Sequence, residues 1–293
     1  MIENFKTYLQ QRNFRESTIN GHLKNVSYFL QWIENVGLYE VENITQNNLL
    51  EYVQHEQKRN IDVATINNIL TSISKYFEFL KAESLVTRNP ARTLRIKGKV
   101  KTITEQPLKY ADLEALYFAY KKLEKNTTKN LQARVNITHQ RNIIIVGLLV
   151  WQGLHSGELE KLEVSHINLD EGKIYVPSGA RSNSRTLQLH VQQVVQLHTY
   201  LHGSIHIRND EKLFKGRMSD IIQALLEELK GLNPIIKNAQ HIRASVILYW
   251  LKQYNKRQVQ YMAGHKYIDS TERYAIQETD SLTDLLVKHH PFG

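Results

Sequence analysis

Apolar side chains recur at steps of three and four residues through the first third of the chain, the spacing that puts them on one face of a helix. Helices are predicted to begin near Ser17 and at Thr45, the first of these ending at Gly37, and a further helix is predicted from Ala64 to Ala82. The buried face of this last helix is predicted to carry Ile66, Ile69, Leu70, Ile73, Phe77 and Leu80. Residues 1 to about 95 are therefore expected to form a helical bundle.

The pattern changes in the second half of the chain. It is helical again from Tyr110, and residues 142–152 are apolar enough to form a buried helix. Residues 167–176 show two short alternating runs around a turn signal, which predicts a hairpin, and residues 186–190 alternate as a further strand would. After Val191 the pattern is helical. The predicted fold is mainly α with a small antiparallel sheet, in which a helical N-terminal domain precedes an α+β domain.

A boundary is predicted near residue 100. Asn89-Pro90 ends the helical region, because a residue before proline is pushed out of the helical conformation. Residues 92–101 then hold five basic residues, one glycine and no acid, a composition typical of a linker. The expected organisation is a helical domain over 1–98, a basic linker over 99–107 and a second domain over 108–293.

Composition narrows the class of protein. The chain has 293 residues, of which 41% are hydrophobic, and this excludes a disordered chain. It has no cysteine, which excludes disulfides and thiolate metal sites. No apolar run is long enough for a membrane span, and the first residues lack a signal-peptide core, so a cytoplasmic location is expected. A net charge of +9 favours a polyanionic partner such as nucleic acid, although many basic proteins bind none.

Two polar surfaces are candidates for that partner. The face of the 64–82 helix opposite its apolar side carries short polar and basic side chains, which suit a DNA backbone but, for this helix taken alone, are more typical of a solvated face. The lysines of the linker offer an arm that lies along phosphates. The DNA-binding residues predicted in these two segments are Asn67, Asn68, Thr71, Lys75, Lys97, Lys99 and Lys101.

Candidate chemistry concentrates near the C-terminus. Arg243 opens an apolar-faced helix, His265 follows Gly264, and Tyr274 stands nine positions after the histidine (274 − 265 = 9). An arginine fork neutralises a phosphate, a histidine donates a hydrogen bond or proton, and a tyrosine oxygen attacks phosphorus to form an ester. The three residue types together are what covalent phosphodiester cleavage without a metal requires.

The order of motifs in the second half resembles that of the tyrosine recombinases, the phage-integrase family. Their catalytic block has a Gly-Leu-Arg-x-Ser-Glu-Leu pattern, a strand pair with a lysine, His-x-x-Arg, Leu-Gly-His and a tyrosine about nine positions later. The corresponding blocks here are residues 153–162, a predicted sheet with Arg181 and Arg185, Gln240-His241-Ile242-Arg243, Met262-Ala263-Gly264-His265 and Tyr274.

The resemblance implies a site-specific DNA recombinase or integrase, of a mobile element, that cuts and rejoins double-stranded DNA through a 3′-phosphotyrosyl intermediate. It implies that no cofactor and no metal take part. It also implies a clamp of two domains around the duplex, with the N-terminal helices as a core-binding domain. Arg185, on the strand pair, is assigned to DNA binding. The lack of an added N-terminal arm-binding domain favours simple core sites, by family analogy alone.

Three catalytic positions depart from the family pattern. His155 stands in place of the first arginine, and an imidazole lacks the two-pronged fork and is mostly neutral at pH 7. Gln240 stands in place of the histidine of His-x-x-Arg and can donate a hydrogen bond but not shuttle a proton. The strand lysine aligns with Ala180, so Arg181 is the nearest cation. The predicted catalytic set is Tyr274, Arg243, His265, His155, Arg181 and Gln240.

These departures leave two hypotheses. The chain is a working recombinase of a divergent branch, or it is a DNA-binding relative that cleaves weakly or not at all and acts as an architectural subunit. Each lost donor commonly lowers the rate by about 10²–10³. A helical scaffold without a DNA role is disfavoured by the charge, the linker and the motif order.

The end of the chain bears on assembly. Residues 281–287 are predicted to form a short apolar-faced helix after Tyr274. By resemblance it docks into a neighbouring protomer, in a homo-oligomer on DNA that grows from dimer to tetramer in synapsis. Docking on its own domain remains the alternative.

Overall fold

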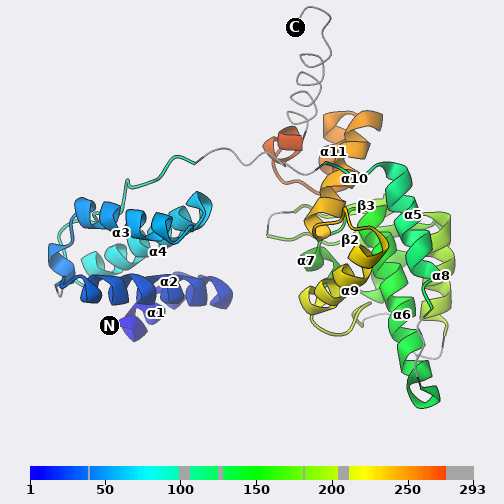
Figure 1. Cartoon of the computed structure of the whole chain (residues 1–293), viewed down its shortest axis with the longest axis horizontal. Helices are drawn as coiled ribbons and strands as arrows, with labels where there is room; N and C mark the ends of the chain where they lie inside the picture. The colour runs from blue at the N-terminus through cyan, green and yellow to red at the C-terminus, as the bar shows by residue number, and fades with distance from the viewer. Residues whose placement is uncertain (39, 99–105, 125–127, 181, 204–210, 275–293) are drawn as a thin grey trace, which may run out of the picture. The chain divides into compact units, whose positions relative to one another are not determined.

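The chain folds into two compact units, 1–100 and 101–293 (Figure 1). The computed structural model describes residues 1–38, 40–98, 106–124, 128–180, 182–203 and 211–274. Each unit has its own hydrophobic core. In these ranges no helix is both long enough and apolar enough to cross a membrane.

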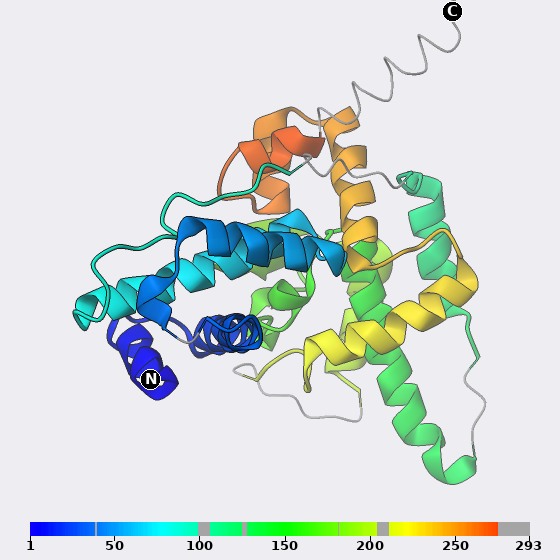
Figure 2. The ribbon, with the colours of Figure 1, turned by 60° about the vertical axis from the view of Figure 1, so that its left-hand side comes forward.

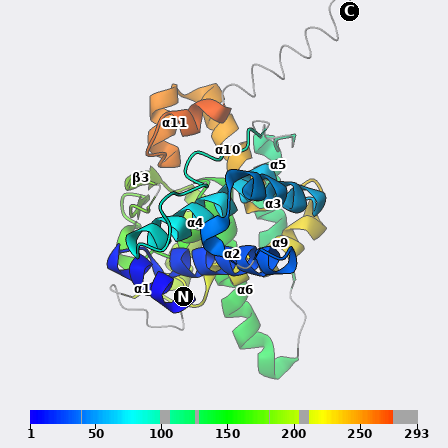
Figure 3. The same cartoon turned by 90° about the vertical axis from the view of Figure 1, so that its left-hand side faces the viewer.

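Unit 1 is a bundle of α-helices. Its helices are α1 (Ile2–Gln11), α2 (Glu16–Asn35), α3 (Gln46–Lys58) and α4 (Val63–Ala82), with a 3₁₀ turn at Val41–Asn43. α2 packs along α4 (Figure 3). Gly37, at φ +78°, ends α2 as predicted, and the side chain of Thr45 caps α3 by accepting from the Asn48 amide. α2 begins before the predicted Ser17.

Aromatic side chains fill the core of unit 1. The ring of Phe5 lies 5.3 Å from that of Tyr76, edge to face, and 5.6 Å from that of Phe79. All three side chains are buried, and each contributes roughly 1.5–3 kcal/mol by leaving water. This packing fixes α4, and with it the polar residues on the opposite face of α4.

Unit 2 combines helices with a small sheet. Its helices are α5 (Tyr110–Lys121), α6 (Lys129–Val150), α7 (Ser156–Leu159), α8 (Val191–Leu201), α9 (Met218–Leu232), α10 (Ala239–Gln253) and α11 (Lys256–Ala263), with a 3₁₀ turn at Val164–His166. The strands β1 (Ile167–Asn168), β2 (Lys173–Val176) and β3 (Arg185–Gln188) form an antiparallel sheet in that order, with Ile174 opposite Leu187. The predicted hairpin and further strand are confirmed, whereas the buried helix predicted over 142–152 begins much earlier.

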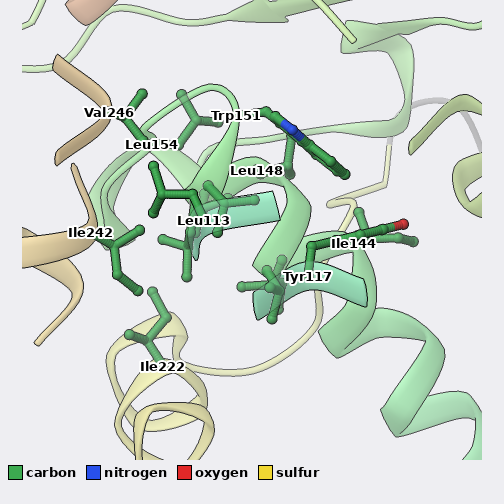
Figure 4. Packing of buried hydrophobic residues seen from close by; sticks show 14 of the residues in the cluster. Leu113, Tyr117, Ile144, Leu148, Trp151, Leu154, Ile222, Ile242 and Val246 are labelled. Carbon is green, nitrogen blue, oxygen red and sulfur yellow. The ribbon is translucent and has the colours of Figure 1, made fainter. Parts of the chain in front are cut away.

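The core of unit 2 surrounds the apolar half of α6 (Figure 4). α6 contributes Ile144 and Leu148, and the helices around it contribute Leu113 and Tyr117 from α5, Ile222 from α9, and Ile242 and Val246 from α10. α10 is therefore anchored on both sides of Arg243. α10 and α11 lie side by side at the end of unit 2 opposite the N-terminal end of α6 (Figure 2).

Candidate active site

Arg243 is held at the centre of the site by backbone carbonyls from two distant segments. Its Nη1 donates to the carbonyl of Gly153, and its Nη2 donates to the carbonyl of Ala263 at 2.7 Å. The side chain is only 7% exposed. The guanidinium therefore has one orientation, set by α10 and by the ends of α6 and α11.

A buried carboxylate, Glu158, lies between two arginines. Its Oε1 accepts from Nη1 of Arg185 at 2.7 Å, and its Oε2 lies 3.4 Å from Nη1 of Arg243. Burial alone would raise the pKa of Glu158, but the two guanidiniums more than offset this and lower it. Glu158 is thus ionised at neutral pH and neutralises part of the charge that the arginines bring. It was absent from the predicted site, although it lies within the recognised 153–162 block.

Arg185 is fully buried, which corrects its assignment to DNA binding. Its side chain is 0% exposed, and Nε donates to the carbonyl of Met262 at 2.7 Å. An enclosed guanidinium cannot reach a phosphate of a duplex. The strand alternation of β3 directs this residue inward, where it pairs with Glu158.

Gly264 makes room for that arginine. It ends α11 in the left-handed conformation, with φ +70°, and a Cβ there would lie 2.3 Å from Nη1 of Arg185. Any side chain at this position would collide with the guanidinium and strain the backbone. The glycine thus fits Arg185 and turns the chain so that His265 enters the site.

His265 is neutral and oriented by a buried hydroxyl. Its Nδ1 lies 2.8 Å from Oγ1 of Thr271, a residue that is 0% exposed. Burial, together with the charges of Arg243 and Arg185, lowers the pKa of His265 to about 4. In the tautomer in which the Thr271 hydroxyl donates to Nδ1, the proton of the neutral ring is on Nε2. Thr271 is a further residue that sequence reasoning did not assign to the site.

Tyr274 meets these residues from the same chain. Its ring stacks on that of His265, with centroids 5.9 Å apart and planes 9° from parallel, and the tyrosine is 8% exposed. Its hydroxyl accepts a hydrogen bond from Nε2 of Gln240 at 3.2 Å. Burial raises the pKa of Tyr274, against the opposing effects of Arg243 and the Gln240 hydrogen bond, so the hydroxyl is protonated at neutral pH.

The side chain of Gln240 points to Tyr274, whereas its neighbour His241 turns away. His241 is buried, with Nε2 2.9 Å from the carbonyl of Gln106 and Nδ1 accepting from the Lys237 amide. A step of one residue rotates a side chain about 100° around a helix, so adjacent residues face different partners. The side chain of His241 is therefore directed away from Tyr274.

His155 lies at the edge of the site as the N-cap of α7. Its Nδ1 accepts from the Gly157 amide at 3.1 Å, and its Nε2 lies 3.7 Å from Oε2 of Glu158. Burial lowers the pKa of His155, and Arg243 and Arg185 add to this effect while Glu158 opposes it. The ring is neutral and 43% exposed, so Nε2 remains open to a ligand.

The structure thus brings together Arg243, His265, Tyr274, Gln240 and His155. Of the other predicted residues, Arg181, Lys99 and Lys101 lie outside the described residues. Lys97 is exposed at the end of unit 1. Within the described ranges, there is no cluster of three or more His, Asp or Glu side chains arranged to hold a metal ion.

The polar face of α4 borders a groove within unit 1, with the segment after Pro90 on the other side. Asn68 and Thr71 are exposed there, but Asn67 uses its amide to bind both the N–H and the C=O of Ile96, each at 2.9 Å. Lys75 is paired with Glu78 at 2.8 Å. Asn67 therefore holds the segment in place. Besides these residues the groove is lined by Leu70, Ser74, Ala91, Arg92, Thr93, Leu94 and Arg95.

The chain is similar in sequence to known proteins. Residues 2–84 match the phage integrase N-terminal SAM-like domain. Over 99% of its length the chain is 23% identical to tyrosine recombinase XerC of Bacillus pumilus (strain SAFR-032) and to tyrosine recombinase XerD of Vibrio cholerae (strain El Tor Inaba N16961), covering 96% of each. It is 24% identical to TnP I resolvase of Bacillus thuringiensis over 69% of this chain and 66% of that protein.

Solved structures share the fold. The Tn1549 transposon integrase in complex with circular intermediate DNA aligns with a TM-score of 0.68 at 14% identity, over 93% of this chain and 94% of that one. A lambda integrase dimer bound to a COC′ core site aligns with a TM-score of 0.64 at 16% identity, over 93% of each chain. The mainly helical architecture with a small antiparallel sheet is the one that these integrases have.

Proposed function

Because this chain belongs to the tyrosine recombinase family, we propose that it cuts and rejoins double-stranded DNA at specific sites through a 3′-phosphotyrosyl link on Tyr274. The observation that carries the proposal is the position of the Tyr274 hydroxyl. It is bound by Gln240, stacked on His265 and close enough to Arg243 for their charges to interact, all within one chain.

Arg243 is the proposed anchor for the scissile phosphate. Its hydrogen bonds to Gly153 and Ala263 leave the Nε–H and one N–H of Nη2 without a partner among the described residues. Two such donors suit a non-bridging phosphate oxygen. A guanidinium already locked in place loses little further freedom when DNA binds, which favours electrostatic stabilisation of the transition state.

In the protein without DNA, His155 and His265 are neutral hydrogen-bond donors. Nε2–H of His265 and the open Nε2 of His155 are the proposed donors to the remaining phosphate oxygens. The negative charge of the phosphate, which is greatest in the transition state, favours protonated imidazoles. DNA binding is therefore expected to raise the lowered pKa values of His155 and His265. His155 thus replaces an arginine with a hydrogen-bond donor that becomes protonated when a phosphate binds.

Tyr274 is the proposed nucleophile. Its oxygen attacks phosphorus as the phenol proton passes to solvent water. The P–O5′ bond breaks with its electron pair on O5′, which takes a proton from water, and the 3′ strand end remains as a phosphotyrosyl ester. The ester keeps the energy of the original bond, so that a 5′-hydroxyl from another strand displaces the tyrosine and restores the DNA. Gln240 holds the phenol in place before attack and is not required to move a proton.

Unit 1 is the proposed core-binding domain, with the boundary segment 99–107 as a basic linker and residues 108–293 as the catalytic domain. The groove beside α4 supports this role, since exposed Asn68, Arg92 and Arg95 present donors that suit phosphate oxygens. A homo-oligomer on DNA and a cytoplasmic location remain part of the proposal. The helix predicted over 281–287 lies outside the described residues.

A covalent-capture experiment tests the proposal. The protein is incubated with a pool of nicked duplexes of randomised core sequence, and products that resist SDS are resolved by electrophoresis and sequenced. Wild type is expected to give a protein–DNA adduct on a restricted set of sequences, Tyr274→Phe is expected to give none, and Tyr267→Phe, at a tyrosine that is 67% exposed, is expected to keep it.

Two results would contradict the proposal. A wild type that shifts duplex DNA without forming any adduct would be a DNA-binding protein without cleavage. An adduct that persists in Tyr274→Phe would assign the nucleophile to another residue.

A further inference from the structure

Two polar side chains of α10 hold the end of the predicted linker. Nε2 of His241 lies 2.9 Å from the carbonyl oxygen of Gln106, and the hydroxyl of Ser245 accepts from the N–H of Leu108 at 2.9 Å. His241, Ser245 and Leu108 are all buried. The backbone before and after Pro107, the last residue of the predicted linker, is therefore bound by one helix.

The donors and acceptors of this contact are matched. A carbonyl oxygen can only accept, so Nε2 of His241 carries a proton, and Nδ1 accepts from the Lys237 N–H at 3.4 Å. The Ser245 hydroxyl donates to the carbonyl of His241 at 2.8 Å, which leaves its lone pairs for the N–H of Leu108. Pro107 has a fixed φ and no N–H to pair. The linker end is thus held in one conformation.

The same turn of α10 carries two residues of the candidate active site. Gln240, which binds the Tyr274 hydroxyl at 3.2 Å, and Arg243 are three positions apart in the helix and share one face, called here the catalytic face of α10. His241 and Ser245 are four positions apart and share another face. A movement of this turn at the linker end would therefore move the catalytic face with it.

Packing alone does not call for polar residues at these two positions. The other buried residues of α10, apart from Arg243, are apolar: Ile242, Ala244, Val246, Ile247, Leu248 and Trp250. A buried hydrogen-bonded pair can often be replaced by apolar groups at little cost, whereas a buried backbone group that loses its partner is destabilising. His241 and Ser245 are therefore explained by the backbone groups of the linker end that they bind.

We propose that His241 and Ser245 are positioning residues, which fix the linker end on α10 so that DNA binding by unit 1 aligns the catalytic face of α10 with the scissile phosphate. The role rests on the function proposed above. DNA that is bound by unit 1 constrains unit 2 through the linker, and the two hydrogen bonds deliver that constraint to α10. A loose linker end would instead take up the constraint by its own motion.

Amide hydrogen exchange tests the anchor in the full chain without DNA. Ser245→Ala removes the acceptor of the Leu108 N–H and is expected to speed exchange of that amide about 10-fold. Ile222→Val removes one buried methyl group from α9, in the same core but away from the linker end, and is the matched control. It is expected to leave exchange at Leu108 unchanged.

A double-mutant cycle tests the coupling. The rate of covalent adduct formation at saturating DNA is measured for wild type, for Ser245→Ala, for a Gly-Ser-Gly-Ser insertion between Val100 and Lys101, and for the two changes together. The DNA is a sequence that wild type cleaves in the covalent-capture pool. Saturation removes differences in affinity, and circular dichroism confirms that each variant is folded. Ile222→Val, with and without the insertion, is the control.

Ser245→Ala and the insertion are each expected to slow adduct formation by up to about 10²-fold, because either one lets the catalytic face of α10 lose its alignment. Together they are expected to be no slower than the slower of the two, since a slack linker has no constraint for the anchor to transmit. His241→Leu is expected to behave like Ser245→Ala. His241→Gln keeps an N–H for the carbonyl of Gln106 and is expected to recover most of the rate.

Three outcomes would overturn the role of His241 and Ser245 while leaving the proposed function intact. These are a wild-type rate in Ser245→Ala or in the insertion variant, losses that multiply when the two changes are combined, and unchanged exchange of the Leu108 amide in Ser245→Ala. Absence of an adduct with wild type would overturn the proposed function itself, and the positioning role with it.

Discussion

Two pairs of arginines show how differently the same side chain is used in the two units. Arg185 and Arg243 of unit 2 are buried around Glu158, and each also donates to a backbone carbonyl of a distant segment. Arg92 and Arg95 of unit 1 are exposed along the groove beside α4. The buried pair is part of the fold as well as of the site, so that changes there affect stability, whereas the exposed pair is free to respond to a partner.

Removal of the carboxylate shared by the buried pair is expected to have the largest effect. Glu158→Ala leaves two guanidiniums buried without a counter-charge, which typically costs about 3–5 kcal/mol of unfolding free energy. Urea unfolding followed by circular dichroism measures the loss. Glu171→Ala, at an exposed acid paired with Lys173, is the control and is expected to leave the unfolding free energy nearly unchanged. Similar losses in both variants would show that Glu158 is not structurally required.

Gly264→Ala is expected to disturb the buried Arg185–Glu158 pair through a change in the neighbouring backbone. A left-handed residue with a side chain costs about 1–2 kcal/mol, and the new Cβ would also push Arg185 away from Glu158. The same unfolding assay tests this. Gly231→Ala, in α9, where nothing lies within 4 Å of a new Cβ, is expected to stabilise the protein by up to about 1 kcal/mol. An unchanged unfolding free energy in Gly264→Ala would mean that Arg185 and Glu158 can shift to make room for the new Cβ.

Acidification provides a smaller, titratable perturbation of unit 2. The folded pKa of His265 is about 4, below its unfolded value of 6.5, so between these pH values the unfolded state binds the extra proton and stability falls as pH falls. Glu158 also stabilises the folded state in its ionised form, because its pKa is lower in the folded than in the unfolded state. This stabilisation is present above the unfolded pKa and is lost as pH falls through the folded pKa. Unfolding free energies at pH 7, 6 and 5 are expected to decline less steeply in His265→Gln than in wild type. Parallel declines would assign the loss to other groups.

Replacing one of the exposed arginines, Arg92 or Arg95, is expected to give the smallest effect and to change only DNA binding. Arg95→Ala should leave the unfolding free energy unchanged, weaken duplex binding and reduce the slope of log K against log salt by about 0.9, the value for one phosphate contact. Fluorescence anisotropy at several salt concentrations measures this. Lys81→Ala, at the exposed end of α4 and away from the groove, is the control. An unchanged salt slope in Arg95→Ala would remove the groove from the proposed DNA surface.

Much of the fold follows from local patterns. The periodicity of apolar residues placed α4 within one residue of its observed start, and the alternation around a turn placed β1, β2 and β3. The start of α6 was missed because its N-terminal half is polar and shows no apolar face. Where the first turns of a helix extend away from the core, they have no apolar periodicity from which the start of the helix could be predicted.

The candidate site was predictable only in part. Arg243, His265 and Tyr274 were recognised from their order and intervals, and the structure brings them together. Glu158 and Thr271 were not singled out, because an acid and a threonine are common on any surface. Their importance comes from the partners that the fold brings to them, such as Arg243 for Glu158, 85 residues away, and the ring of His265 for Thr271.

The sequence by itself determined which residue types are available for phosphoryl transfer and in what order, since intervals such as that from His265 to Tyr274 are covalent properties of the chain. Only the tertiary structure decided which charges are buried, which are paired and which remain free. It turned Arg185 from an expected DNA contact into an internal partner of Glu158, and it brought the hydroxyl of Tyr274 to the side chain of Gln240. The reason is physical: burial and pairing depend on what other segments contribute to the same volume, and no local pattern contains that information.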